Sequence, residues 1–216
     1  MGFLDGILYV IPAVLLAMTV HEYAHAKMAH SLGDNTAQRE GRLTLNPLEH
    51  VDPLGLLMLI IVRFGWAKPV PINPFNFKGN RDAGIIKVSL AGPLANLALA
   101  FVSLVLLRVV ATIGASLPLQ SDLLGVIQAL QTFFMLLARL NLYFMVFNLI
   151  PLPPLDGSKI LTSVLSPKAR MQYQQVEAYA PLILILLLVT RTLPRILVPI
   201  AETILSTLFF IVFGII

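Results

Sequence analysis

The chain has 216 residues, of which 57% are hydrophobic and only 12% are charged, and its net charge is +4 at pH 7. Soluble domains carry about 25% charged residues, so this composition indicates a protein whose solvent is largely the lipid bilayer. The sequence has no basic run or aromatic–basic patch, which excludes nucleic acid as an expected partner, and its lack of cysteine excludes disulfides and thiolate metal sites.

The first apolar stretch predicts a membrane helix. Residues 6–20 carry no charge, and the helical pattern continues through His21 toward Ser31, where Gly33 is a typical helix stop. The beginning, "MGFLDGILYVIPAVLLAM", lacks the basic region of a signal peptide. We therefore expect a first span that is retained.

The motif "HEYAH" at residues 21–25 lies at the end of this stretch. On a helix, His21 and His25 are one turn apart and share a face, so both imidazoles can bind one metal ion, while Glu22 can act as general base toward water. Ionisable groups in a span cost about 2.5–3.5 kcal/mol each, which a zinc site returning roughly 10–16 kcal/mol would offset. The motif predicts a zinc site rather than a chance cluster of polar residues.

The stretch 34–84 is rich in Pro, Gly and Asn and differs from a span. Its apolar part, 54–62, would form a helix of roughly 14 Å, which is too short to cross a bilayer, so we expect a re-entrant or interfacial segment. The sequence "AKPVPINPF" at 67–75 alternates like an edge strand, and the backbone of Val70 and Ile72 could pair with an extended substrate. A plain proline-rich loop is the alternative.

Further apolar stretches complete the expected fold. They lie at 88–107, at 123–150, near 178–193 and near 196–216, and Arg191, Pro194 and Arg195 split the last two. We expect an all-α polytopic membrane protein, a bundle of about five to six membrane helices with a small β or re-entrant segment beside the active site. Residues 1–216 would form a single domain, with a catalytic core at about 6–166 and C-terminal helices at about 176–216.

Charge in the connections predicts the orientation. The 63–87 stretch holds one carboxylate and five cations, namely Arg63, Lys68, Lys78, Arg81 and Lys87, and the 156–177 stretch holds Lys159, Lys168 and Arg170. The 108–122 connection is balanced. By the positive-inside rule, the first two stretches are cytoplasmic, so the histidine end of the first helix would face the cytoplasm.

A zinc site with two histidines needs a third protein ligand. Glu40 and Glu49 are candidates in the mixed loop, but Asp156 in "FNLIPLPPLDGSKIL" is the better one, because a span ends before it, prolines stiffen the chain and Asp-Gly opens a new helix. The alternative role of Asp156 is a helix N-cap, which aspartate favours.

The chain resembles the site-2 proteases, intramembrane zinc metalloproteases, in their short form without PDZ or CBS domains. The resemblance rests on "HEYAH", "NLIPLPPLDG", "LAGPLANL" and "FGWAKPVPINP". It implies that His21, His25 and Asp156 bind one Zn²⁺ per chain, that Glu22 is catalytic, and that Asn148 stabilises the tetrahedral intermediate. The expected activity is hydrolysis of peptide bonds in or next to the transmembrane segment of a membrane protein; the rival is a non-catalytic zinc-binding transporter or scaffold.

We expect several other residues in the membrane helices to have structural roles. Gly92, Pro93 and Asn96 in "AGPLAN" would permit close helix packing and a kink. Asn141 would form a hydrogen bond between helices in the membrane, with a place in the active-site cavity as the alternative. Arg139, within the 123–150 span, would pair with another side chain or extend toward the interface.

Overall fold

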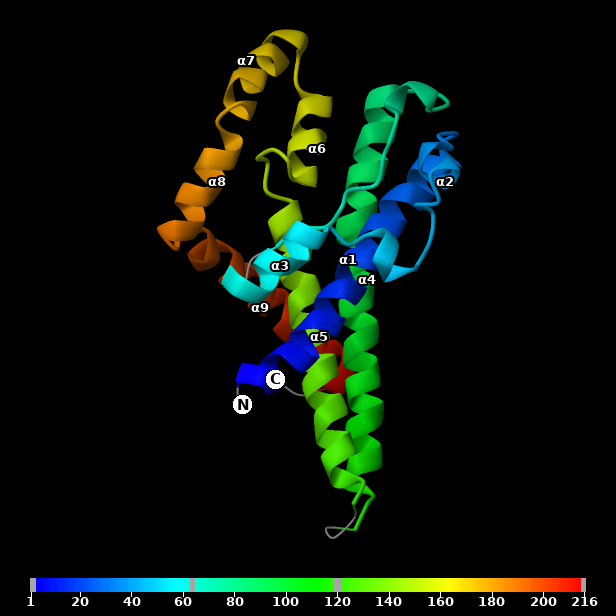
Figure 1. The fold of residues 1–216 in the computed structure, drawn as a ribbon, viewed down its shortest axis with the longest axis vertical. Helices are drawn as coiled ribbons and strands as arrows, with labels where there is room; N and C mark the ends of the chain where they lie inside the picture. The colour runs from blue at the N-terminus through cyan, green and yellow to red at the C-terminus, as the bar shows by residue number, and fades with distance from the viewer. Residues whose placement is uncertain (1–2, 63–64, 119–121, 215–216) are drawn as a thin grey trace.

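The computed structural model describes residues 3–62, 65–118 and 122–214 and shows the all-α membrane fold that the sequence predicts. Figure 1 shows α4 and α5 as a long antiparallel pair, with α1 crossing them. The helices are α1 Phe3–Ser31, α2 Thr36–Arg39, α3 Pro53–Val62, α4 Arg81–Ala115, α5 Leu124–Asn148, α6 Asp156–Val164, α7 Pro167–Glu177, α8 Ala180–Val189 and α9 Thr192–Phe213, with short 3₁₀ turns at Pro47–Glu49 and Pro74–Asn76.

Among the described residues, α4, α5 and α9 are long and apolar enough to cross a membrane. A fourth span exists if α7 and α8, which meet at a bend of 59°, count as one broken span. The predicted five to six membrane helices also counted the first apolar stretch, which lies within α1.

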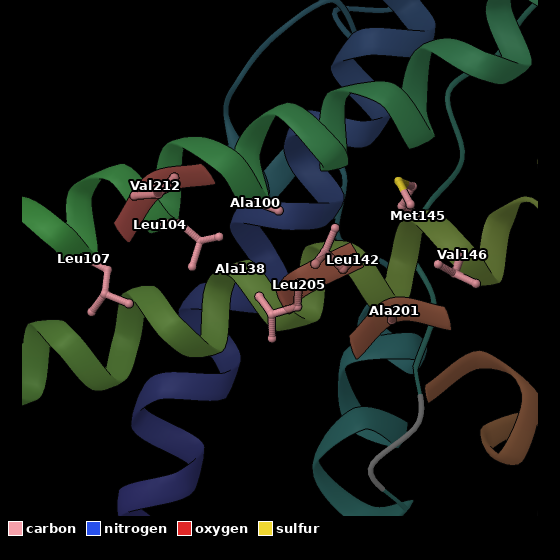
Figure 2. Packing of buried hydrophobic residues seen from close by; sticks show 10 residues of the cluster. All are labelled: Ala100, Leu104, Leu107, Ala138, Leu142, Met145, Val146, Ala201, Leu205 and Val212. Carbon is pink, nitrogen blue, oxygen red and sulfur yellow. The ribbon is translucent and has the colours of Figure 1, made fainter. Parts of the chain in front are cut away.

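The core lies where α4, α5 and α9 pack together (Figure 2). Its buried members include Ala100 and Leu104 of α4, Ala138 and Leu142 of α5, and Leu205 of α9. Small residues beside leucines let the helices approach closely, which is how helices pack in a bilayer.

Arg139 pairs with another membrane helix, as predicted. Its Nε lies 3.0 Å from Oε1 of Glu202 on α9, and the Tyr143 hydroxyl donates to the same oxygen at 2.7 Å. This pair joins the last helix to α5.

The first helix ends where the sequence predicts. Gly33 has a φ of +103°, a left-handed conformation that glycine adopts at little cost, and it follows the last turn of α1. The residues after it fold back along the end of α1, where Ala37 and Val70 pack against Ala26.

The segment 66–78 runs beside the end of α1 but forms no regular strand in its described residues. It holds an isolated antiparallel bridge between Val51 and Ala67 and the 3₁₀ turn at Pro74–Asn76. The segment therefore has the form of the alternative, a proline-rich loop, in which the N–H of Val70 donates to a side chain and prolines lie on both sides of it. Arg63, counted in the predicted basic loop, lies outside the described residues.

The other boundaries differ from the predictions at capped helix ends. Helix α4 begins at Arg81, because the Asn80 side chain accepts a hydrogen bond from Ala83 N at 2.9 Å. It continues to Ala115, so Arg108 lies within it rather than in a loop. The basic 156–177 stretch holds α6, the helix expected to open at Asp-Gly, and also α7. Arg191 has a φ of +56°, which breaks the C-terminal run and starts α9 at Thr192.

Candidate metal centre

His21 and His25 project from one face of α1 near its buried end, and both are less than a tenth exposed. Their ring centroids are 4.5 Å apart with the planes nearly perpendicular, and the two Nε2 atoms are 2.9 Å apart. The i, i+4 spacing, which predicted that both histidines bind one metal ion, therefore brings the two Nε2 atoms together.

The other ring nitrogen of each histidine faces an acceptor on α4. Nδ1 of His21 lies 2.6 Å from Oδ1 of Asn96, and Nδ1 of His25 lies 2.7 Å from the Val88 carbonyl oxygen. A neutral imidazole carries one proton, and these oxygens hold it on Nδ1, so each Nε2 presents a lone pair.

Asp156 reaches the histidines from the first turn of α6. Its Oδ2 lies 3.2 Å from Nε2 of His21 and 3.0 Å from Nε2 of His25, while its Oδ1 lies 3.1 Å from Nζ of Lys159. The helix has no side-chain cap hydrogen bond, and its N-cap residue is Leu155, so the alternative role of Asp156 as an N-cap is not observed.

The turn before α6 depends on Gly157. A Cβ there would lie 2.3 Å from the Leu149 carbonyl oxygen and 2.5 Å from that of Ile150. Gly157 thus lets the start of α6 lie against the end of α5, and Asp156 thereby reaches the two histidines of α1.

The three converging atoms fit a metal cation. Two Nε2 lone pairs and a carboxylate oxygen meet in a buried place, and Oδ2 of Asp156 finds no hydrogen-bond donor among the described residues. Donors placed 2.0–2.1 Å from a tetrahedral zinc ion lie roughly 3.3 Å apart, close to the observed 2.9–3.2 Å. Repulsion among these lone pairs is relieved when a cation lies between them.

Gly92 makes room for this arrangement. A Cβ at residue 92 would lie 2.5 Å from Nε2 of His25 and 2.7 Å from Nε2 of His21. The expectation that "AGPLAN" permits close helix packing is confirmed, and the group packed against Gly92 is the histidine pair itself.

Glu22 lies beside the pair and faces the 66–78 segment. The backbone N–H of Val70 donates to its Oε2 at 2.9 Å. Glu22 is half-buried, whereas the two histidines are buried. Its carboxylate is therefore held by the 66–78 segment and does not belong to the group of three converging atoms.

Asn96 is the site residue whose role the sequence did not indicate. It is fully buried, and besides facing His21 its amide donates to Asn141 Oδ1 at 2.7 Å and to the Ala17 carbonyl at 3.1 Å. The hydrogen bond predicted between helices for Asn141 is thus confirmed, with Asn96 as its partner. The "LAGPLANL" motif was the available signal, but its spacing alone does not link position 96 to residue 21.

The other candidates have no described contact with the three converging atoms. Asn148 is the last residue of α5, and its side-chain amide donates to the Phe144 carbonyl at 3.0 Å. Glu40 and Glu49 are exposed, at the end of α2 and in the first 3₁₀ turn. In the described part of the chain, the acidic residue that groups with the two histidines is Asp156.

Comparisons with known proteins agree with this geometry. The model of peptidase family M50 matches residues 9–190. "Putative zinc metalloprotease YwhC" of Bacillus subtilis is 41% identical over 182 residues, covering 84% of this chain and 80% of the relative. "Putative zinc metalloprotease Rip2" of Mycolicibacterium smegmatis is 32% identical over 200 residues, covering 90% and 72%. No solved structure matches significantly.

Proposed function

Because the chain belongs to peptidase family M50 and is an intramembrane zinc metalloprotease, we propose that His21, His25 and Asp156 hold the zinc ion and that Glu22 and Asn148 carry the proton transfer and oxyanion stabilisation. The alternative of a non-catalytic zinc transporter or scaffold is not favoured by any feature of the site.

One observation supports this assignment most directly. Nε2 of His21, Nε2 of His25 and Oδ2 of Asp156 converge while the opposite atom of each group is engaged by Asn96, Val88 and Lys159 respectively. Outer partners of this kind orient metal ligands and keep the ligating atom deprotonated. Three ligands from the chain would leave the fourth position of a tetrahedral zinc ion to water, as in catalytic zinc sites.

The remaining residues supply the rest of the chemistry. Zinc bound there acts as a Lewis acid toward water and the scissile carbonyl. Glu22 accepts a proton from the attacking water and delivers it to the leaving amine. The amide of Asn148 turns from Phe144 to donate to the oxyanion, which a neutral group can do without adding a charge.

The proposed roles predict different outcomes for two substitutions. Glu22→Gln should retain about one zinc per chain and lose cleavage of a reconstituted membrane substrate, because the ligands remain and the base does not. Asp156→Ala should lose both. Metal analysis of purified protein together with a cleavage assay measures this. Near wild-type cleavage by Glu22→Gln would reject the mechanism.

We also propose that the site faces the cytoplasm and that the substrate is the transmembrane segment of a membrane protein. The 66–78 segment, α6 and α7 carry basic residues and lie toward the end of the bundle where α4 begins, whereas α4 ends and α5 begins at the opposite end (Figure 1). One domain at 1–216, with its catalytic part at about 6–166, holds all the proposed site residues.

The orientation can be tested by cysteine labelling, because the chain has no cysteine of its own. A single cysteine at exposed Lys168 should be protected from an impermeant maleimide in intact cells, and one at exposed Ser116 should be labelled. The reverse pattern would place the site on the outer face.

A further inference from the structure

The 66–78 segment is held against the protein at several points. Lys68 N donates to the His50 carbonyl at 2.9 Å, Asn73 N donates to Oδ2 of Asp34 at 2.7 Å, and Lys78 N donates to the Leu32 carbonyl at 2.7 Å. Between the first two of these attachments, the N–H of Val70 donates to Glu22. The position of this N–H is therefore set by the attachments on either side of it.

Asp34 is the central attachment. It is 1% exposed, and its carboxylate accepts hydrogen bonds from Asn73 N, from the Asn76 amide at 2.8 Å, and from Thr36 N and Oγ1 at 3.1 and 2.5 Å. No cation pairs with it among the described residues. A buried carboxylate costs free energy unless hydrogen bonds satisfy it, and here two of the donors belong to the 66–78 segment.

A second buried group supports the beginning of the segment. Arg42 is 4% exposed, and its guanidinium donates to the Lys68 carbonyl at 2.7 Å. His50 is 2% exposed, and its Nε2 lies 2.8 Å from the Thr44 carbonyl. The loop after α1 thus forms a polar support for the segment.

We infer that Asp34 is a positioning residue for the proposed general base: it holds the 66–78 segment so that the N–H of Val70 fixes the carboxylate of Glu22. The inference rests on the proposed role of Glu22. Asp34 has no described contact with Glu22 or the three converging atoms, so it acts through the backbone of the segment.

The physical reason lies in the freedom of a glutamate side chain. Helix α1 fixes the Cα of Glu22 but leaves three side-chain torsions, and a carboxylate displaced by about 1 Å loses about a hundredfold in rate. A hydrogen bond from a backbone N–H restrains one carboxylate oxygen of Glu22, provided that the segment carrying this N–H is itself rigid. Asp34 supplies that rigidity from the loop beyond the end of α1.

The experiment compares variants of the zinc-loaded full chain reconstituted in lipid. Asp34→Ala removes the carboxylate, Asp34→Asn keeps one acceptor oxygen, and Asn76→Ala removes one exposed donor while leaving Asp34 intact. Asp52→Ala is the matched control, because Asp52 accepts a hydrogen bond from Gly55 N at 2.8 Å in α3 and has no described bond to the 66–78 segment. For each variant, kcat, KM, zinc content and backbone hydrogen exchange of the peptide covering 66–78 are measured.

We expect kcat to fall about tenfold or more in Asp34→Ala and about threefold in Asn76→Ala, with zinc content unchanged and KM within twofold. Asp34→Asn should recover part of the loss, and Asp52→Ala should match the wild type. Hydrogen exchange in the segment should rise in the same order. A uniform loss of fold would instead lower zinc content and raise exchange throughout the chain.

Two results would overturn the inference. One is a kcat within twofold of the wild type in Asp34→Ala while Glu22→Gln is inactive. The other is a raised KM with unchanged kcat, which would assign the segment to substrate binding. Full activity in Glu22→Gln would reject the proposed function itself, and the exchange data would then still show whether Asp34 holds the segment.

Discussion

Oδ1 of Asn96 lies 2.6 Å from Nδ1 of His21, and this contact joins the middle of α4 to the motif on α1. The same amide donates to Asn141 on α5, so one buried side chain orders three helices around the metal centre. Asn96 therefore holds Nδ1 of His21, so that Nε2 is the ring nitrogen that faces His25 and Asp156.

Replacing Asn96 should weaken zinc binding without unfolding the protein. Asn96→Ala leaves Nδ1 of His21 without its acceptor, and outer-partner losses of this kind cost about 10–100-fold in metal affinity. Chelator competition measures the affinity. Ser103→Ala is the control, since Ser103 is also buried on α4 but bonds within its own helix, to the Leu99 carbonyl at 2.6 Å. Equal zinc affinity in both variants would contradict this role.

Gly92→Ala should disrupt the centre by steric pressure. The added methyl would lie 2.5 Å from Nε2 of His25, so the histidines or α4 must move. We expect at least a tenfold loss of zinc affinity and of activity. Gly125→Ala is the matched control, because a Cβ there meets nothing within 4 Å. A fully zinc-loaded and active Gly92→Ala variant would contradict this prediction, because it would show that α4 can move away from the histidines without loss of zinc affinity.

Lys159 should tune the carboxylate ligand. Its Nζ lies 3.1 Å from Oδ1 of Asp156, which leaves Oδ2 to face the histidines. The ammonium group is half-exposed, so Lys159→Met should weaken zinc binding modestly, by about three- to tenfold. Lys168→Met, with an exposed side chain in α7, should leave the affinity unchanged. Titration with a competing chelator distinguishes the two.

Asn148→Ala should separate catalysis from metal binding. If its amide donates to the oxyanion, its loss lowers kcat by about 10²–10³-fold while zinc content is retained. Asn148→Asp is a useful second variant, because an acceptor of negative charge should be at least as damaging. Cleavage at the wild-type rate in Asn148→Ala would leave Asn148 with its hydrogen bond to Phe144 as its role.

The stability contributed by Asp34 should depend on pH in one direction. Burial opposes its ionisation, but hydrogen bonds from Thr36, Asn76 and Asn73 outweigh that effect and lower the pKa of Asp34 below its ordinary 3.8. A lowered pKa in the folded state gives stability that is fully present above the unfolded value and is lost as pH falls through the folded value.

Thermal unfolding of the wild type and Asp34→Asn tests this dependence. The wild type should be more stable by about 2 kcal/mol at pH 7 and at pH 5. The difference should shrink only below the unfolded pKa of 3.8. A difference that already shrinks between pH 7 and pH 5 would contradict it.

The sequence alone determined the membrane class, the long helices and the shared helix face of the two histidines in "HEYAH". These follow from local rules: an uncharged run long enough to cross a bilayer must satisfy its backbone within a helix, and an i, i+4 pair shares one face whatever surrounds it. Gly33 and Arg191 marked helix ends correctly for the same reason, since backbone conformation is local.

Only the tertiary structure decided which distant groups meet. The contact of Asn96 with His21 and the attachment of Asp34 to Asn73 connect residues far apart in the chain, and no periodicity encodes such a distance. The pattern at 67–75 predicted free strand edges, but a folded protein satisfies its buried donors and acceptors with whatever lies nearest. Here the N–H of Val70, which was expected to pair with an extended substrate, donates to the carboxylate of Glu22.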